Sequence, residues 1–137
     1  MLGHFIAMKS CFNQKYLSIL SEGKISFNQA DIKKCTILIM RYVGKYITLQ
    51  YEKGKYLSCN TYGAIELIEK KIVGENERFE IEWLDENLFT LKACNGFYLS
   101  VQKDEKIETN QKNVGVNEQF SMTLQKKETI LEFLNLV

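Results

Sequence analysis

The sequence repeats one short motif, Tyr-Leu-Ser, three times at nearly equal intervals. The copies begin at Tyr16, Tyr56 and Tyr98, so the second follows the first by 40 residues and the third follows the second by 42. Self-similarity at a fixed period of this length indicates one supersecondary unit used three times, with neighbouring units sharing a core. The predicted repeats cover about 4–44, 45–86 and 87–124.

Each copy shows the pattern of four short strands. An alternating segment precedes each tyrosine, and its apolar residues are expected to face a core. These inward candidates are Ile6 and Met8, Ile47 and Leu49, and Phe89 and Leu91. An isoleucine stands nine residues after each tyrosine, beyond turn-forming residues, which predicts a hairpin in every copy.

A fourth alternating segment closes each copy. Its inward candidates in the second copy are Phe79, Ile81 and Trp83, and Phe120 begins the same pattern in the third copy. In the first copy the segment runs from Cys35 to Arg41, where the inward register stays open.

Twelve short strands separated by turns at about 10-residue spacing are typical of an all-β barrel or sandwich. Three propeller blades would fall below the usual number of about four to eight. The threefold pattern therefore predicts a β-trefoil, in which six strands form a short barrel and three hairpins cap one end. With 137 residues, 45% of them apolar, the chain is large enough for one core, and we expect a single domain over 1–137.

A short apolar C-terminal extension, 125–137, follows the last predicted strand. Its large apolar residues are Ile130, Leu131, Phe133, Leu134, Leu136 and Val137. Their spacing suits a helix better than a strand. Two roles stay open: the extension covers a barrel mouth or strand edge of its own domain, or it forms a homodimer contact through 130–137.

Motifs around the tyrosines resemble the repeat of the fascin-like β-trefoil family, in the branch of fascin and hisactophilin. The second copy reads Gly54-Lys55-Tyr56-Leu57-Ser58, Gly63-Ala64-Ile65 and Glu77-Arg78-Phe79, and the third reads Asn95-Gly96-Phe97-Tyr98-Leu99-Ser100 and Glu118-Gln119-Phe120. The resemblance covers residues 4–124 and implies a non-enzymatic module that binds F-actin. Hisactophilin is rich in histidine, whereas this chain has a single histidine, which removes the pH-sensing chemistry of such a surface.

The charge balance excludes several partner classes. Eighteen Lys and Arg against seventeen Asp and Glu leave a formal net charge of +1, so the long-range field that draws proteins to nucleic acid is missing. The longest aliphatic run, Ile37 to Met40, is far shorter than the roughly 18 residues of a membrane helix. We therefore expect no nucleic-acid partner and no membrane insertion.

The N-terminal residues, Met1 to Ser10, lack the long apolar region and cleavage site of a secretory signal. Four cysteines are present: Cys11, Cys35, Cys59 and Cys94. No two of them form a C-x-x-C pair, and with one histidine they make a poor zinc site. We expect reduced thiols in a cytoplasmic protein that holds no metal or other cofactor.

The sequence offers two candidate pairs of catalytic residues, one of histidine and cysteine and one of two glutamates, and supports neither. His4 and Cys11 are seven residues apart on one predicted strand, which separates them by about 23 Å. Glu80 and Glu82 are about 6.6 Å apart along another strand, a spacing that superficially suits a glycosidase pair, but both are expected to face water. We therefore expect no enzymatic activity and no catalytic residues.

Lysines in the loop after each predicted hairpin are the remaining candidates for function. They are Lys33, Lys34, Lys70, Lys71 and Lys112. Symmetry predicts a ring of positive charge that suits an acidic surface such as an actin filament, although exposed lysines also simply solubilise a protein. The alternatives are a sugar-binding trefoil, without the Gln-x-Trp motif of ricin-type lectins, and an interaction scaffold with a non-actin protein partner.

Overall fold

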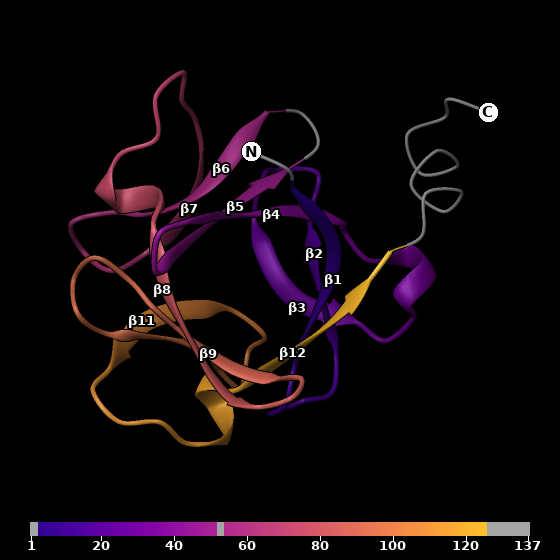
Figure 1. Cartoon of the computed structure of the whole chain (residues 1–137). Coiled ribbons are helices and arrows are strands. Elements are labelled where there is room, and N and C mark those ends of the chain that lie inside the picture. Colours follow the sequence, from indigo (N-terminus) through magenta and orange to yellow (C-terminus); the bar gives the residue numbers. More distant parts are fainter. Residues whose placement is uncertain (1–2, 52–53, 126–137) are drawn as a thin grey trace.

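The computed structural model of the chain describes residues 3–51 and 54–125, within which twelve strands form one sheet (Figure 1). The first repeat contains β1 (His4–Ser10), β2 (Tyr16–Ile19), β3 (Ile25–Gln29), the 3-10 helix η1 (Ile32–Lys34) and β4 (Leu38–Val43). The second contains β5 (Tyr46–Tyr51), β6 (Lys55–Cys59), β7 (Ile65–Glu69), η2 (Glu75–Glu77) and β8 (Phe79–Asp85). The third contains β9 (Leu88–Lys92), β10 (Tyr98–Val101), β11 (Ile107–Gln111), η3 (Val116–Glu118) and β12 (Phe120–Leu124).

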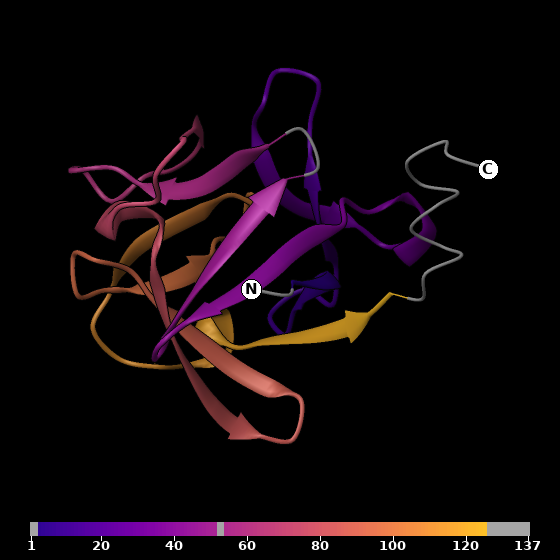
Figure 2. The same cartoon turned by 45° about the horizontal axis from the view of Figure 1, so that its top comes forward.

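Six strands close into a barrel. Each pairs antiparallel with the next in the order β1, β4, β5, β8, β9 and β12, and β12 pairs with β1 to complete the ring. The remaining strands form the three hairpins β2–β3, β6–β7 and β10–β11. Strands β1 and β12 lie side by side although they come from opposite ends of the described chain (Figure 1 and Figure 2). This arrangement confirms the predicted all-β trefoil architecture.

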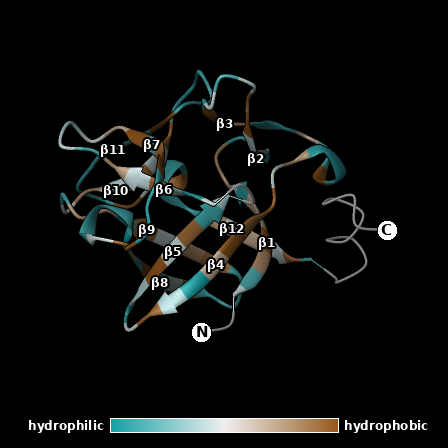
Figure 3. Cartoon of the chain, turned by 90° about the horizontal axis from the view of Figure 1, so that it is seen from above, coloured by the Kyte–Doolittle hydropathy of each residue, from teal (hydrophilic) through white to brown (hydrophobic). Residues whose placement is uncertain are grey.

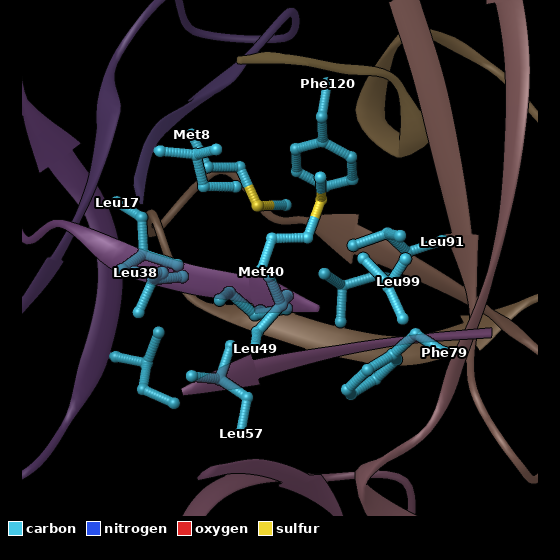
Figure 4. Packing of buried hydrophobic residues seen from close by; sticks show 14 of the residues in the cluster. Met8, Leu17, Leu38, Met40, Leu49, Leu57, Phe79, Leu91, Leu99 and Phe120 are labelled. Carbon is cyan, nitrogen blue, oxygen red and sulfur yellow. The ribbon is translucent and has the colours of Figure 1, made fainter. Parts of the chain in front are cut away.

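The barrel is filled by the apolar residues that alternate along its strands. All six inward candidates from the segments before the tyrosines are buried, as are the leucines of the three Tyr-Leu-Ser motifs. Ring contacts join Phe120 to Phe27, with centroids 5.4 Å apart, and to Phe89, at 6.1 Å. Figure 4 shows Phe120 together with Leu49 and Leu91 in one cluster of buried residues. Apolar and hydrophilic residues are interspersed along β1, β4 and β5, whereas most connecting loops are hydrophilic (Figure 3).

The first repeat adopts the register that the sequence left open. Leu38 and Met40 face the barrel and are buried. Cys35 and Ile37 instead pack against Ala7 in a small second cluster of buried residues beside the barrel. Apolar residues therefore occupy both faces of this segment, and each face has its own core.

Trp83 is not an inward core residue, contrary to the prediction from alternation. Its side chain is 43% exposed, while Phe79 on the same strand is buried and Ile81 is half-buried. Alternation gives the side of the sheet on which a residue lies, but it does not give the depth along the barrel axis. Trp83 lies at the barrel mouth, where β8 undergoes a register shift and the indole contacts the ring of Phe89 at 5.3 Å.

A buried serine and a buried glutamate connect the Tyr-Leu-Ser motif of the second repeat to its Glu-Arg-Phe motif. The Ser58 hydroxyl donates to Glu77 Oε2 at 2.6 Å, and the Gly74 N–H donates to Glu77 Oε1 at 2.8 Å. Both side chains are buried, with Glu77 fully removed from solvent. The carboxylate thus fixes the start of β8 against β6, and we call this pair the Ser–Glu clasp.

The third repeat contains the same clasp. Ser100 donates to Glu118 Oε2 at 2.6 Å, and the Gly115 N–H donates to Glu118 Oε1 at 2.6 Å. In the first repeat Thr36 replaces the glutamate, and its hydroxyl accepts from the Ile19 N–H at 2.9 Å. The predicted homodimer contact at 130–137, like the rest of 126–137, lies outside the described residues.

Candidate functional site

The five candidate lysines lie in the loops that connect each hairpin to the last strand of its repeat. Lys33 and Lys34 belong to η1, Lys70 and Lys71 follow β7, and Lys112 follows β11. All five are exposed. The loops lie at separate places around the periphery of the molecule in both views (Figure 1 and Figure 2), so the lysines do not converge on one pocket.

These five ammonium groups have no acidic partner among the described residues. Ion pairs in this part of the chain involve other lysines, namely Lys15 with Glu105, Lys45 with Glu80 and Lys106 with Asp104. Near η1, Asp31 accepts from the Lys33 backbone N–H at 2.9 Å and caps the turn. The side-chain charges of the loops therefore face solvent.

Two of the three loops also expose aliphatic side chains. Ile72, next to Lys71, is 85% exposed, and Val116, four residues after Lys112, is 52% exposed. Burying an exposed aliphatic side chain against a partner is favourable, and a nearby lysine selects an acidic partner. The loops can therefore supply both apolar contact and charge.

Three of the hollows in the described surface bear on function. One, of about 420 Å³, lies among the hairpins over Ile25, Ile65 and Ile107. A second, of about 660 Å³, is an apolar groove at the barrel mouth beside Trp83 and Leu124. The third, of about 350 Å³, lies between the second and third repeats, and we call it the Arg78 hollow. It is lined by Tyr46, Glu75, Arg78, Glu80, Lys92, Ala93, Cys94 and Gly96.

Elements of two repeats build the Arg78 hollow. Arg78 lies between η2 and β8, and Lys92 ends β9, the strand that pairs with β8. The turn after β9 is tied to η2, because the Cys94 thiol donates to Asn76 Oδ1 at 3.3 Å. Partial burial raises the pKa of Cys94, and nearby Cys59 adds to the shift, so this thiol stays protonated at neutral pH.

An ion pair at the edge of the hollow neutralises one of its carboxylates. Lys45 Nζ lies 3.1 Å from Glu80 Oε1 and 5.4 Å from the centroid of the Tyr46 ring. The hydrogen bond to Glu80 raises the pKa of Lys45 above its usual range. The Glu80 carboxylate is therefore already paired with Lys45. Glu82, on the same strand, is exposed to solvent.

Sequence patterns did not single out the Arg78 hollow, because its walls come from positions 46 to 96 of the chain. Arg78 belongs to the quoted Glu-Arg-Phe motif, but a motif does not show which groups meet across strands. In the described residues, no three His, Cys, Asp or Glu side chains are grouped to hold a metal ion. The same part of the chain contains no helix long and apolar enough to cross a membrane.

Solved structures with a similar fold support the trefoil assignment. They include a designed threefold symmetric protein, ThreeFoil, with a TM-score of 0.70, 14% identity and coverage of 87% of this chain and 97% of that protein. SeviL bound to asialo-GM1 saccharide has a TM-score of 0.73 and 12% identity, over 88% of this chain and 97% of SeviL. An endo-β-galactosidase of Clostridium perfringens has a TM-score of 0.75 and 16% identity, over 91% of this chain and 33% of the enzyme. At these identities the likeness shows the fold alone.

Sequence comparison identifies the family to which this trefoil belongs. Fascin-2 of Bos taurus is 22% identical over 95 residues, and human Fascin-2 is 21% identical over 95 residues. The matches cover 69% of this chain but 19% of either relative, so the chain spans about a fifth of their length. The model of the Fascin domain matches residues 12–122, which is most of the chain. The chain therefore belongs to the fascin domain family and is a β-trefoil binding module.

Proposed function

We propose that this protein binds actin filaments through the lysines of its three loops. One observation carries the proposal: Lys33, Lys34, Lys70, Lys71 and Lys112 are exposed and have no acidic partner among the described residues. An acidic protein surface would supply the missing partners, and complementary charge steers encounter and selects the partner. Membership of the fascin family supports a filament as that surface.

The proposal includes a cytoplasmic location. All four cysteines are free thiols, which suits a reducing compartment. It also includes the absence of catalysis, because the Glu80 carboxylate is held by Lys45 and the Glu82 side chain is exposed to water. An interaction scaffold for another acidic protein would use the same loops, and a role in sugar binding would use the Arg78 hollow.

Co-sedimentation with actin filaments tests the proposal. The parent protein is expected to pellet with filaments at high speed, with an affinity that falls as salt rises. Replacing the five loop lysines with glutamine should weaken binding at least tenfold and flatten the salt dependence. The matched control replaces the five exposed lysines 24, 45, 55, 103 and 106, which changes the net charge equally and should weaken binding much less.

Two results would contradict the proposal in different ways. Equal losses in both variants would show that net charge, and not the loops, governs binding. A parent protein that stays in the supernatant would exclude actin, and binding of the same protein to vesicles of anionic lipid would then assign the loops to a membrane surface instead.

A further inference from the structure

Two positive side chains without an acidic partner face the Arg78 hollow. The Nε atom of Arg78 is buried and has no hydrogen-bond partner, and the guanidinium forms no ion pair among the described residues. Lys92 rests over the ring of Tyr98, with its Nζ 5.6 Å from the centroid, and within 3–51 and 54–125 it forms no ion pair with a carboxylate. Buried donors are normally satisfied, and this unpaired donor belongs to a side chain that lines the hollow. A ligand in the hollow could supply the acceptor that the Arg78 guanidinium lacks among the described residues.

The free charges around the hollow sum to one positive charge. Glu80 is neutralised by Lys45, which leaves Arg78 and Lys92 against the single carboxylate of Glu75. A ligand with one negative charge matches this balance. A phosphate monoester carries about two negative charges at neutral pH and would also meet Glu75 and Glu80. The balance therefore favours a carboxylate over a phosphate.

The charged residues of the hollow break the internal symmetry of the fold. The register places Phe79, Phe120 and Leu38 at equivalent positions, because they pair with Ile47, Phe89 and Ile6 respectively. The residue before each is Arg78, Gln119 and Ile37. Folding needs the apolar residue in every repeat, but it does not need the arginine, which occurs once. The shared core therefore does not account for the arginine, and its side chain is available for a role specific to the second repeat.

The hollow fits a ligand of about one sugar ring. Its volume of about 350 Å³ is at the lower end of ligand pockets, which run from roughly 300 to 1,000 Å³. Its lining residues include Tyr46, Glu75 and Arg78, whose side chains carry an aromatic ring, a carboxylate and a guanidinium. Aromatic rings pack against apolar ring faces, carboxylates accept from hydroxyl groups, and a guanidinium binds a carboxylate in bidentate fashion.

We propose that the Arg78 hollow binds an acidic monosaccharide, with its carboxylate on Arg78 and Lys92 and its hydroxyl groups on Glu75. The site lies apart from the lysine loops and does not depend on filament binding. The same chemistry is present in a free sugar acid and in a terminal acidic sugar of a glycan, and the site requires only that the ring and its carboxylate are accessible.

Titration of the ¹⁵N-labelled protein with glucuronate tests this proposal, and glucose is the matched probe, because the two sugars differ only in the carboxylate. Glucuronate should shift the amide signals of Arg78, Cys94 and Gly96 saturably. Glucose should bind at least tenfold more weakly. The same titration with methyl glucuronoside tests whether a terminal residue of a glycan is accepted as well as the free sugar acid.

Variants separate the site from general charge effects. Arg78→Gln should weaken glucuronate binding at least tenfold, and Arg78→Lys should recover part of it. The control, Lys24→Gln, removes one positive charge from an exposed hairpin and should leave the affinity unchanged. Dispersed amide spectra establish that each variant is folded, and Lys92→Gln replaces Arg78→Gln if the latter is not.

Three outcomes would overturn the proposal. They are the absence of a saturable shift with glucuronate, equal affinity for glucose, and undiminished binding by folded Arg78→Gln. Inorganic phosphate is included as a fourth probe. Saturable binding of phosphate at this site, without binding of glucuronate, would replace the acidic sugar with a phosphate ligand.

Discussion

Buried serine and glutamate side chains in the second and third repeats satisfy one another. The Ser–Glu clasps bring the serine of the Tyr-Leu-Ser motif to the glutamate that closes the same repeat, about 18 residues later in the chain. A buried carboxylate without such donors would be strongly destabilising. The motif therefore specifies a polar contact as well as an apolar core, and the contact explains why both residues recur together.

Removing one hydroxyl of a clasp should be costly. Ser58→Ala and Ser100→Ala each leave a buried carboxylate oxygen with one donor fewer, and each is expected to lower the free energy of unfolding by about 1–3 kcal/mol. Ser18→Ala is the matched control, since its repeat has Thr36 in place of the glutamate and this serine is half-buried. Urea denaturation measures all three, and an equal loss at Ser18 would contradict the clasp.

The thiol of Cys35 should make stability depend on alkaline pH. Burial raises its pKa to about 11, from 9.0 in the unfolded chain. Below pH 9 the thiol is neutral in both states. Between pH 9 and 11 only the unfolded state releases the proton, so stability falls by roughly 1.4 kcal/mol per pH unit.

Cys35→Ala isolates this effect from other groups that titrate in the same range. The parent protein should lose about 2–3 kcal/mol more than the variant between pH 9 and 11, measured by denaturation under reducing conditions. Parallel curves for the two proteins would show that the thiol is not held neutral by the fold.

Strands and hairpins of this protein depend on a few deeply buried residues. Leu57 of β6 and Phe79 of β8 are 0% and 1% exposed in the shared core. Leu57→Ala or Phe79→Ala should each destabilise the fold by about 2–5 kcal/mol. Ile72→Ala, at a side chain that is 85% exposed, should change stability by less than about 0.5 kcal/mol. Thermal denaturation compares them, and an unchanged midpoint for both core variants would refute the alignment of the repeats.

The second hairpin is joined to the third at Gly63. This glycine has φ +85°, and Thr109 donates to its carbonyl oxygen from the backbone at 3.1 Å and from the hydroxyl at 2.6 Å. A Cβ atom on Gly63 would lie 3.0 Å from the Thr109 carbonyl oxygen. Gly23 has φ +79°, but no atom would lie within 4 Å of its added Cβ.

These two glycines separate backbone strain from packing. Gly23→Ala should cost about 1–2 kcal/mol, the penalty for a left-handed residue with a side chain. Gly63→Ala should cost roughly 1–3 kcal/mol more, because its neighbour is backbone that must shift. Denaturation of both variants measures the difference, and equal losses would show that the hairpins do not contact one another closely.

Much of the fold could be predicted from the Tyr-Leu-Ser spacing, because every repeat must bury the same apolar positions. Trp83 was placed wrongly, since alternation carries no information on where a barrel ends. The candidate lysines could be named from the sequence because each lies in the loop after a hairpin. Arg78 could not be recognised as part of a hollow, because Tyr46 and Lys92 are brought to it only by the pairing of β5, β8 and β9.

At the scale of the whole molecule, if the protein binds actin filaments as proposed, the number of filament contacts per particle decides whether it decorates or bundles them. Bundling needs two contacts in one particle, and one trefoil with one set of loops offers a single contact. A monomeric protein should therefore pellet with filaments only at high speed. A dimeric protein should bundle filaments at low speed.

Deletion of residues 128–137 distinguishes these cases when it is combined with a measurement of mass in solution. If the protein is a dimer through 130–137, the deletion should abolish bundling and retain filament binding. Low-speed bundling by a protein that is shown to be monomeric would contradict the argument, because a second filament contact would then exist on the same trefoil.

The pairing of β1 with β12 also has a consequence for the order of events on the ribosome. The barrel cannot close until β12 is available, although β1 is complete at Ser10 and β12 ends only at Leu124. At about 5–20 residues per second, the ribosome needs roughly 6 to 23 seconds to add the intervening residues. During that interval the edge of β1 that β12 later occupies has no partner. An unpaired strand edge invites pairing with other chains, so the nascent protein passes through its most aggregation-prone state before translation of its last repeat is complete.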